Sequence, residues 1–503
     1  MSELIISVSG LRGIVGETLT PEVASRYARA FAAGLPAGPI VITQDGRASG
    51  PMLAEALKAG LTAAGRDVLD AGVAATPTTG VLVRHLNAAG GIQISASHNP
   101  AEYNGLKLFS AEGRVIPATA GEQVIVRFRA NPEPGASAPG GNLRGGEEAL
   151  KTQNTPGADA PGSVQVVADT LSHHRDLVLA LVDVKRIQAK NFHVLLDANH
   201  GSGSVLGQPL LEFLGCRVTL LGGTPDGQFA HTPEPTAENL AGVLTKVKAV
   251  GADVGFCTDP DADRLAVIDE TGRYLGEEYT LSMCVDHVLR HDSPLATPRV
   301  ASDAAKLVSL TSHPSPLTAN HSPPGADASG SVITNCSTSR MSEDLAKKYH
   351  VPFFRSAVGE ANVVDLMRAK NALLGGEGNG GVIEPRVGWV RDSFVGMAYL
   401  LDAMAARGLK ISELADELPR YEIVKTKMTV ARGKIPAALA ALEKHFANAT
   451  ADKLDGLRLD WPGKWLLVRA SNTEPVVRAI AEAGTAAEAR RLCEEAAGVI
   501  GHI

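Results

Sequence analysis

Short apolar runs that end in polar loops rich in glycine or aspartate recur along the chain and constrain its fold more than any other feature. Examples are GPIVITQDGR (residues 38–47), NFHVLLDANHGSG (191–203) and ADVGFCTDPDADR (252–264). Stretches with the composition of helices follow the first two, at residues 51–65 and 205–215. Alternating strands and helices predict α/β domains with parallel or mixed sheets. In such sheets, functional residues collect in loops at the carboxyl ends of strands.

The length of the chain bounds the number of domains. A chain of 503 residues corresponds to about three or four domains of ordinary size. From about residue 420 the pattern changes to helix–strand–strand–helix, which predicts a smaller α+β domain. Residues 131–163 and 309–331 are rich in Pro, Gly, Ser and Ala. Such segments bury too little surface to offset chain entropy, so we expect flexible insertions there.

Composition excludes several classes of protein. Lys+Arg 48 against Asp+Glu 55 gives a net charge of -7, which argues against a nucleic-acid partner. The five cysteines include no CxxC pair of the kind that binds zinc, and such an odd, sparse set in a long chain is typical of a reducing compartment. The N-terminus lacks the features of a signal peptide, and no window approaches the ~18 apolar residues of a membrane helix. We therefore expect a cytoplasmic protein without a membrane partner.

A candidate nucleophile lies in GGIQISASHNPAEYNGLKLF, residues 90–109. A short apolar strand leads into a turn favoured by Asn99 and Pro100, which would expose Ser97. Exposure is what a nucleophilic serine needs, together with a proton acceptor. The GxSxG motif of hydrolases is absent. An ordinary turn with a local serine hydrogen bond explains the hexapeptide equally well.

A candidate metal site follows the strand ADVGFCT, where Asp259, Asp261 and Asp263 stand at alternate positions. Three carboxylates in a tight loop repel one another, and a hard cation such as Mg²⁺ or Ca²⁺ removes that cost. An EF-hand does not fit, because Arg264 takes the place of the required glycine and a strand precedes the loop. Arg264 beside the carboxylates suggests a phosphate in the same site. A solvated acidic turn is the simpler alternative.

Three weaker motifs complete the set. GEGNGG, from Gly376, directs Glu377 and Asn379 outward. A possible anion cradle with hydroxyl, amide and guanidinium donors comprises Arg469, Ser471, Asn472, Thr473 and Arg478. Glycines flank Arg12 in a tight turn near the N-terminus. Each of the three, taken alone, is also compatible with an ordinary surface loop.

Together and in this order, the motifs resemble the α-D-phosphohexomutase family, which includes phosphoglucomutases, phosphomannomutases and phosphoglucosamine mutases. The motifs that carry the resemblance are SGLRG, ASHNP with YNGLK, DPDADR, and RASNTEP. QDGR (residues 44–47), PDGQF and PEPTAENL are also similar. The resemblance covers nearly the whole chain.

The resemblance implies a fold: three similar α/β domains with mixed sheets and a smaller C-terminal α+β domain around a central cleft. The domains it implies span residues 1–168, 169–285, 286–415 and 416–503. It also implies a resting enzyme phosphorylated on Ser97, with Mg²⁺ on Asp259, Asp261, Asp263 and a phosphate oxygen of Ser97. Lys107 would be the general acid/base.

The remaining roles are implied in the same way. Arg12 and Arg264 would contact the transferring phosphoryl group, with His98 nearby. Glu377 and Asn379 would contact sugar hydroxyls. The cradle of Arg469, Ser471, Asn472, Thr473 and Arg478 would hold the phosphate that does not react.

The implied reaction interconverts hexose 6-phosphate and hexose 1-phosphate through a hexose 1,6-bisphosphate, in a monomer or homodimer. The GEGNGG loop differs from the form with Ser and His in many bacterial members. Phosphoglucosamine mutase is our first expectation, with phosphomannomutase/phosphoglucomutase as the alternative. Two lesser alternatives are a sugar phosphatase with an aspartate nucleophile and a phosphosugar-binding protein without turnover.

Overall fold

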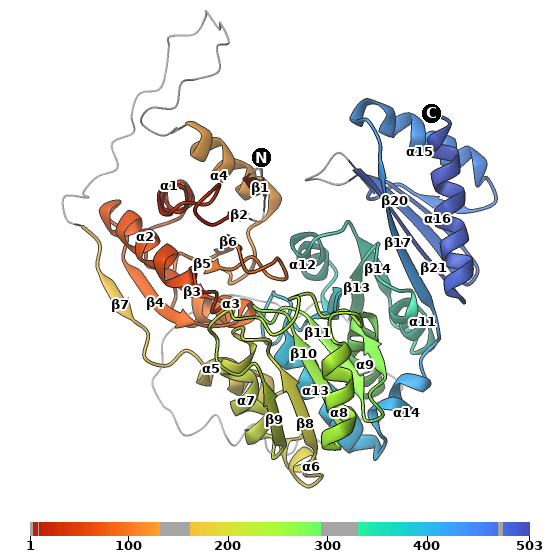
Figure 1. Ribbon diagram of the computed structural model, residues 1–503, viewed down its shortest axis with the longest axis horizontal. Coiled ribbons are helices and arrows are strands. Elements are labelled where there is room, and N and C mark those ends of the chain that lie inside the picture. Colours follow the sequence, from red (N-terminus) through yellow and green to blue (C-terminus); the bar gives the residue numbers. More distant parts are fainter. Residues whose placement is uncertain (1–3, 9, 131–160, 293–329, 471–475) are drawn as a thin grey trace, which may run out of the picture.

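The computed structural model contains four β-sheets, arranged in sequence order (Figure 1). It describes residues 4–8, 10–130, 161–292, 330–470 and 476–503. The sheets have seven, five, four and five strands. Within the described residues, no helix has the length and apolar character needed to cross a membrane.

The first sheet is mixed, in the order β1-β2-β6-β5-β3-β4-β7. Its elements are β1 (Ile5–Ser7), β2 (Gly10–Ile14), α1 (Pro21–Ala32), β3 (Ile40–Gln44), α2 (Gly50–Ala63), β4 (Val68–Val73), α3 (Thr76–His85), β5 (Gly90–Ile94), β6 (Tyr103–Ser110), α4 (Ala118–Ala130) and β7 (Val164–Val166). The start of α1 is locally encoded, because Thr20 accepts a hydrogen bond from the Val23 amide and Pro21 begins the helix.

The second sheet is also mixed, in the order β12-β11-β10-β8-β9. Its elements are α5 (Ser172–Leu179), α6 (Val184–Gln188), β8 (His193–Asp197), α7 (Gly203–Phe213), β9 (Arg217–Leu221), α8 (Ala241–Val250), β10 (Val254–Thr258), β11 (Leu265–Asp269) and β12 (Tyr274–Gly276). Strands β8, β10 and β11 are wholly buried, which explains their near-continuous apolar sequences.

The third sheet has the order β14-β13-β15-β16. Its elements are α9 (Glu277–Asp292), β13 (Ser331–Asn335), α11 (Met341–Lys348), β14 (Phe353–Ser356), α12 (Glu360–Ala369), β15 (Ala372–Glu377), β16 (Gly381–Ile383), α13 (Ser393–Arg407) and α14 (Ile411–Asp416). Helix α13 begins where the Asp392 carboxylate accepts from the amides of Phe394 and Val395, and ends at Gly408 with φ 63°.

These three sheets share one arrangement, which confirms the expected similarity of the three α/β units. In each, a central strand (β3, β8 or β13) has a parallel neighbour on both sides, and an antiparallel strand follows. The antiparallel strand is joined to its neighbour by a hairpin, in β5–β6, β10–β11 and β15–β16. Each hairpin contains one of the motifs singled out from the sequence.

The fourth sheet is wholly antiparallel, in the order β17-β21-β20-β19-β18. Its elements are β17 (Glu422–Thr429), the 3-10 helix η2 (Arg432–Lys434), α15 (Ile435–His445), β18 (Thr450–Asp452), β19 (Leu457–Trp461), β20 (Lys464–Ala470), β21 (Val476–Ala483) and α16 (Ala486–Gly501). The α+β class is confirmed. The expected helix–strand–strand–helix order was wrong, because β17 precedes α15: its alternating exposed and half-buried residues give no apolar run.

The second and third sheets share one hydrophobic core, which includes Leu196, Phe256, Leu374 and Phe394. The first and fourth sheets have cores of their own. Helix α9 packs against β11 of the second sheet and β15 of the third. The domain boundaries stay a prediction, and those at residues 285/286 and 415/416 fall inside α9 and α14.

The proposed insertions lie outside the described residues except at their ends. Gly162 donates to the Thr62 carbonyl at 2.9 Å, and Ser163 bonds the Asp67 carboxylate. Ser331 opens β13. Gly162 and Ser163 are therefore bonded to the first α/β unit, and Ser331 belongs to the third sheet.

Candidate active site

The β5–β6 and β10–β11 hairpins meet at one buried contact. Ser97 Oγ donates to Asp259 Oδ2 at 2.7 Å, and both residues are buried, so the expected exposure of Ser97 was wrong. Ser97 has φ 51°, a left-handed conformation that is uncommon for residues other than glycine. Its amide donates to Ser95 Oγ at 2.8 Å. The two sequence motifs therefore form one site, with the serine hydroxyl directed at a carboxylate.

The Ser97 turn is organised by Arg47, a wholly buried arginine from the QDGR motif. Its guanidinium donates to the carbonyls of Ser97 and Asn99, each at 2.6 Å. The same group donates to the carbonyls of Pro100 at 2.7 Å and Tyr103 at 3.0 Å. Asp45 neutralises it with an ion pair of 3.1 Å.

The second sheet reaches this turn through the PDGQF motif. Phe229 lies under the Arg47 guanidinium, with the ring centroid 4.9 Å from Cζ. A Cβ on Gly46, which has φ 94°, would lie 2.7 Å from the Pro225 carbonyl oxygen. The close approach of the two motifs therefore requires glycine at this position.

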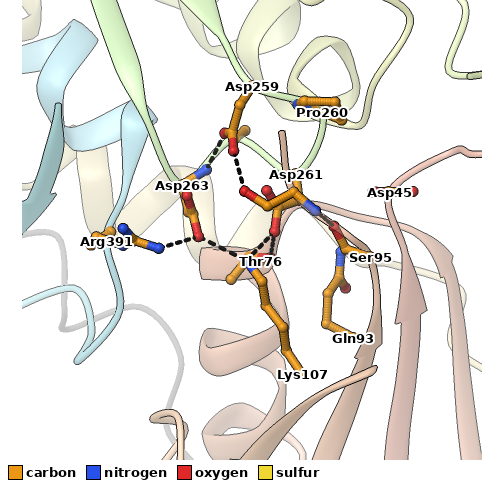
Figure 2. A network of polar contacts seen from close by, with 12 residues as sticks. Asp45, Thr76, Gln93, Ser95, Lys107, Asp259, Pro260, Asp261, Asp263 and Arg391 are labelled. Atoms are coloured by element: carbon orange, nitrogen blue, oxygen red, sulfur yellow. Dashed lines mark hydrogen bonds and ion pairs between the residues drawn. The ribbon is translucent and has the colours of Figure 1, made fainter. Parts of the chain in front are cut away.

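The three aspartates of the β10–β11 hairpin form a buried cluster (Figure 2). One ligand atom from each of Asp259, Asp261 and Asp263 lies within 4.8 Å of the others. The hairpin turns at Ala262, which has φ 53°. Asp259 Oδ1 accepts from the amides of Asp263 and Arg264, each at 3.2 Å. Such a cluster has the oxygen donors that a hard cation requires.

Three neighbouring segments position the β10–β11 hairpin, which contains the three aspartates. Thr76, the first residue of α3, donates its hydroxyl to Asp261 Oδ2 at 2.6 Å. Ser202 donates its amide and hydroxyl to the Pro260 carbonyl, at 2.7 and 3.0 Å. Ser393, the first residue of α13, donates to the carbonyls of Ala262 and Arg264, both at 2.8 Å. The hairpin is therefore bonded to elements of all three α/β units.

Lys107, from YNGLK on β6, reaches the same carboxylates. Its ammonium donates to Asp261, and to Asp263 Oδ2 at 2.8 Å (Figure 2). Burial alone would lower the pKa of Lys107, but the charges of Asp261 and Asp263 raise it. The pKa of Asp259 is raised well above its ordinary value by burial and by the other two carboxylates. The repulsion among the three carboxylates therefore favours the binding of a further cation.

Cationic side chains surround the serine turn. Arg12 donates to Asn99 Oδ1 at 3.2 Å. Arg264 is 3.6 Å from Glu234, and its Nε is buried without a hydrogen-bond partner among the described residues. His98 Nδ1 lies 3.3 Å from Ser97 Oγ. Burial, followed by the charges of Arg264 and Arg12, lowers the pKa of His98 to about 2, so its ring is neutral at physiological pH. The two arginines provide a site for an anion.

Glu377, at the end of β15, is buried and bonded on both oxygens. Oε1 accepts from Asn335 Nδ2 at 2.7 Å and Oε2 from the Arg391 guanidinium at 2.8 Å. Asn379 in the hairpin lies 3.5 Å from Glu377 Oε2 and accepts from the Gly381 amide at 3.3 Å. The β15–β16 hairpin is therefore bonded to the β10–β11 hairpin through Arg391, which also donates to Asp263 at 2.7 Å.

The RASNTEP motif of the fourth sheet is described only in part, because Ser471, Asn472 and Thr473 lie outside the described residues. The flanking strands place Arg469 on β20 directly opposite Arg478 on β21, and Arg478 opposite Lys427 on β17. Like charges on opposed positions of a sheet repel one another, and a bound anion removes that cost. Asp455 neutralises Arg469 at 2.9 Å, whereas Arg478 Nε is buried without a partner among the described residues.

Sequence reasoning missed four side chains of this site: Arg47, Thr76, Glu360 and Arg391. Arg391 contacts carboxylates of Asp263, Glu360 and Glu377 at 2.7–2.8 Å. The QDGR motif contains Arg47, but no role for this residue was predicted from it. The other three are single residues outside every motif, so no local pattern marks them.

Comparisons with known proteins agree with this geometry. The chain matches the family phosphoglucomutase/phosphomannomutase in four parts: alpha/beta/alpha domain I over residues 4–134, domain II over 172–272, domain III over 317–421 and the C-terminal domain over 426–499. The chain therefore belongs to this family. It is an enzyme of the phosphohexomutase class, whose members are isomerases.

Two relatives and two solved structures illustrate the range of the family. A phosphoglucomutase/phosphomannomutase of Thermococcus kodakarensis is 34% identical over 96% of both chains. A phosphoglucosamine/phosphogalactosamine mutase of Sulfurisphaera tokodaii is 28% identical over 98% of both chains. The structure of a phosphoglucomutase/phosphomannomutase family protein from Burkholderia thailandensis has a TM-score of 0.74, with 25% identity over 99% of this chain and 98% of that one.

The more distant N-acetylphosphoglucosamine mutase of Aspergillus fumigatus has a TM-score of 0.53, with 14% identity over 99% of this chain and 95% of that one. That protein was crystallised with GlcNAc-6P and magnesium.

Proposed function

We propose that this phosphohexomutase interconverts hexose 6-phosphates and hexose 1-phosphates by passing a phosphoryl group between Ser97 and the sugar, through a hexose 1,6-bisphosphate. The observation that carries this proposal is the 2.7 Å hydrogen bond from Ser97 Oγ to Asp259. It brings a hydroxyl nucleophile into a buried cluster of carboxylates, which is the arrangement that a metal-assisted phosphoryl transfer needs.

Mg²⁺ is the ion we propose for this cluster, with Asp259, Asp261, Asp263 and a phosphate oxygen on Ser97 as ligands. Asp261 Oδ1 and Asp263 Oδ1 are buried without a hydrogen-bond partner among the described residues, so the donor set fits a hard cation. When bound, the ion supplies positive charge that stabilises the transferring phosphoryl oxygens. We assign Arg12 and Arg264, whose charges both act on His98 in the serine turn, to the same phosphoryl group, with His98 beside it.

Proton transfer is the role we propose for Lys107, whose raised pKa keeps its ammonium protonated. As the sugar hydroxyl attacks phosphorus, the bond from phosphorus to Ser97 Oγ breaks and the bond to the sugar oxygen forms. Lys107 donates its proton to Oγ and receives the proton of the hydroxyl, so that charge balances. The second transfer runs in reverse after the bisphosphate has reoriented.

Reorientation requires that the sugar and its second phosphate remain bound. We assign sugar contacts to Glu377 and Asn379. The non-reacting phosphate is assigned to Arg469, Ser471, Asn472, Thr473 and Arg478. The unpartnered Nε of Arg478 supports this assignment.

The sugar we propose first is glucosamine phosphate, and mannose or glucose phosphate is the alternative. Relatives named for amino-sugar phosphates and for glucose and mannose phosphates both align with nearly the whole chain. All five cysteines are free and buried, which supports the proposed cytoplasmic location. The oligomeric state, a monomer or a homodimer, stays a prediction.

Phosphorus NMR tests the reaction directly. The purified protein is mixed with Mg²⁺, a trace of hexose 1,6-bisphosphate and, in separate tubes, the 6-phosphates of glucosamine, glucose and mannose. We expect the 1-phosphate to appear, fastest from glucosamine 6-phosphate. Release of inorganic phosphate alone would indicate a phosphatase, and no change in any tube would overturn the proposed turnover.

A further inference from the structure

Glu360 has a buried carboxylate oxygen that nothing in the described chain satisfies. It is the first residue of α12, and its side chain is 10% exposed. Oε2 accepts from Arg391 Nε at 2.7 Å, whereas Oε1 is buried without a hydrogen-bond partner among the described residues. A buried, unpartnered charged group costs free energy, and a ligand that donates to it recovers that cost.

The surroundings of Glu360 lack positive charge. Arg391 is a single cation shared by Glu360, Glu377 and Asp263. Lys107 is already paired with Asp261 and Asp263. Burial, opposed by Arg391 and reinforced by Asp263, raises the pKa of Glu360 to about 7. When Glu360 is ionised, Glu360 and Glu377 share the single positive charge of Arg391, which leaves one excess negative charge in this group of three.

Glu360 also adjoins the side chains assigned to the sugar. The Gly359 amide, next to it in sequence, donates to Glu377 Oε1 at 3.2 Å. Through Arg391, Glu360 is one side chain away from Asp263 of the metal cluster. Glu360 is therefore linked both to the proposed sugar contact and to the proposed metal ligands, the two groups between which the reacting end of a bound sugar would lie.

We propose that Glu360 is a specificity-determining residue, which accepts a hydrogen bond from the ammonium group at C2 of an amino-hexose phosphate. This inference rests on the proposed mutase function and names the substrate class that the site selects. Carbon 2 adjoins C1, whose oxygen reacts when a hexose 6-phosphate is bound. A C2 hydroxyl can donate to the same oxygen, but only an ammonium also supplies the missing positive charge.

The test compares two sugars on one enzyme preparation. The isosteric variant Glu360→Gln keeps an oxygen that can accept from Arg391 and removes the charge. We expect kcat/KM for glucosamine 6-phosphate to fall by at least about tenfold, as for a lost hydrogen bond to a charged group, and that for glucose 6-phosphate by less than about threefold. Glu360→Asp, which keeps the charge, is expected to retain most of the preference for glucosamine 6-phosphate.

The ratio of the two kcat/KM values does not depend on how much of the variant is folded, so instability cannot imitate the expected result. An equal fall for both sugars would overturn the inference and leave Glu360 as a partner of Arg391 only. Wild-type turnover of glucose or mannose phosphates without glucosamine phosphate would also overturn it, while the mutase function would stand. Absence of interconversion with every hexose phosphate would instead overturn the proposed function itself.

Discussion

The β5–β6 and β10–β11 hairpins occupy the same place in two similar sheets, yet opposite charges organise them. In the first, the buried guanidinium of Arg47 donates to four backbone carbonyls around Ser97. In the second, the buried carboxylate of Asp259 accepts from two backbone amides. Each hairpin contains a residue other than glycine in the left-handed region, Ser97 with φ 51° and Ala262 with φ 53°.

The difference shows how one topology supplies two complementary halves of a site. The positive charge of Arg47 is bonded to the carbonyls around Ser97, so it offsets their repulsion of the anion proposed on Ser97. In the other hairpin, Asp259 both orders the backbone and presents an oxygen to Ser97. The shared hairpin topology therefore positions the two turns next to each other. The side chain that orders each turn, Arg47 or Asp259, determines whether that turn favours an anion or a cation.

Removing Arg47, the cation that orders the first hairpin, is expected to have the largest effect on stability. Arg47→Ala leaves Asp45 buried without its partner and four carbonyls without a donor, so we expect the free energy of unfolding to fall by about 3–5 kcal/mol. Arg47→Lys restores the charge but not the planar set of donors and should lie in between. Urea denaturation measures both.

Arg217→Ala on β9, an exposed position, is the matched control, with an expected change within about 0.5 kcal/mol. A change of that small size for Arg47→Ala would show that the first hairpin is ordered without its cation.

Neutralising one acid of the second hairpin is expected to have its main effect on activity. Asp261→Asn keeps an acceptor for Thr76 but removes a proposed metal ligand, so we expect kcat/KM to fall by at least about 100-fold. Metal affinity, measured by calorimetry, should fall with it. The thermal midpoint should fall as well, because Lys107 and Thr76 outweigh the effect of burial and lower the pKa of Asp261, so that its charge stabilises the folded state.

Asp176→Asn, at an exposed residue of α5, should leave both quantities unchanged. Unaltered metal affinity in Asp261→Asn would rule out the carboxylate cluster as the metal site.

The third hairpin allows a smaller test through Glu278, a buried acid whose raised pKa is only partly offset by the charge of Lys425. Glu278 accepts from the Ser339 amide at 3.0 Å, and burial raises its pKa to about 8 from an ordinary value of 4.5. A folded-state pKa above the unfolded value contributes stability below pH 4.5 that is lost as pH rises through 8. We therefore expect the thermal midpoint of the wild type to decline over this range, and Glu278→Gln to decline less.

Glu422→Gln, at an exposed residue of β17, should keep the wild-type slope. Identical slopes for Glu278→Gln and the wild type would contradict the raised pKa.

The sequence predicted those parts of the site whose residues are close together along the chain. Asp259, Asp261 and Asp263 are neighbours in one turn, so their cluster was visible before any fold was known. Arg391 lies 128 residues from Asp263, and its contact depends on how two sheets pack. Thr76 and Asp261 are 185 residues apart. Strand β17 was missed because its ladder with β21 stabilises a sequence that has no apolar run.

The most direct test of the central claim is to locate the phosphoryl group. The wild-type protein is incubated with a hexose 1,6-bisphosphate and Mg²⁺, and intact mass spectrometry is followed by peptide mapping. The account predicts one phosphoryl group per chain, on Ser97, that transfers to added hexose phosphate and is absent from Ser97→Ala. Phosphate on Asp259 or Asp261, or full turnover by Ser97→Ala, would contradict it.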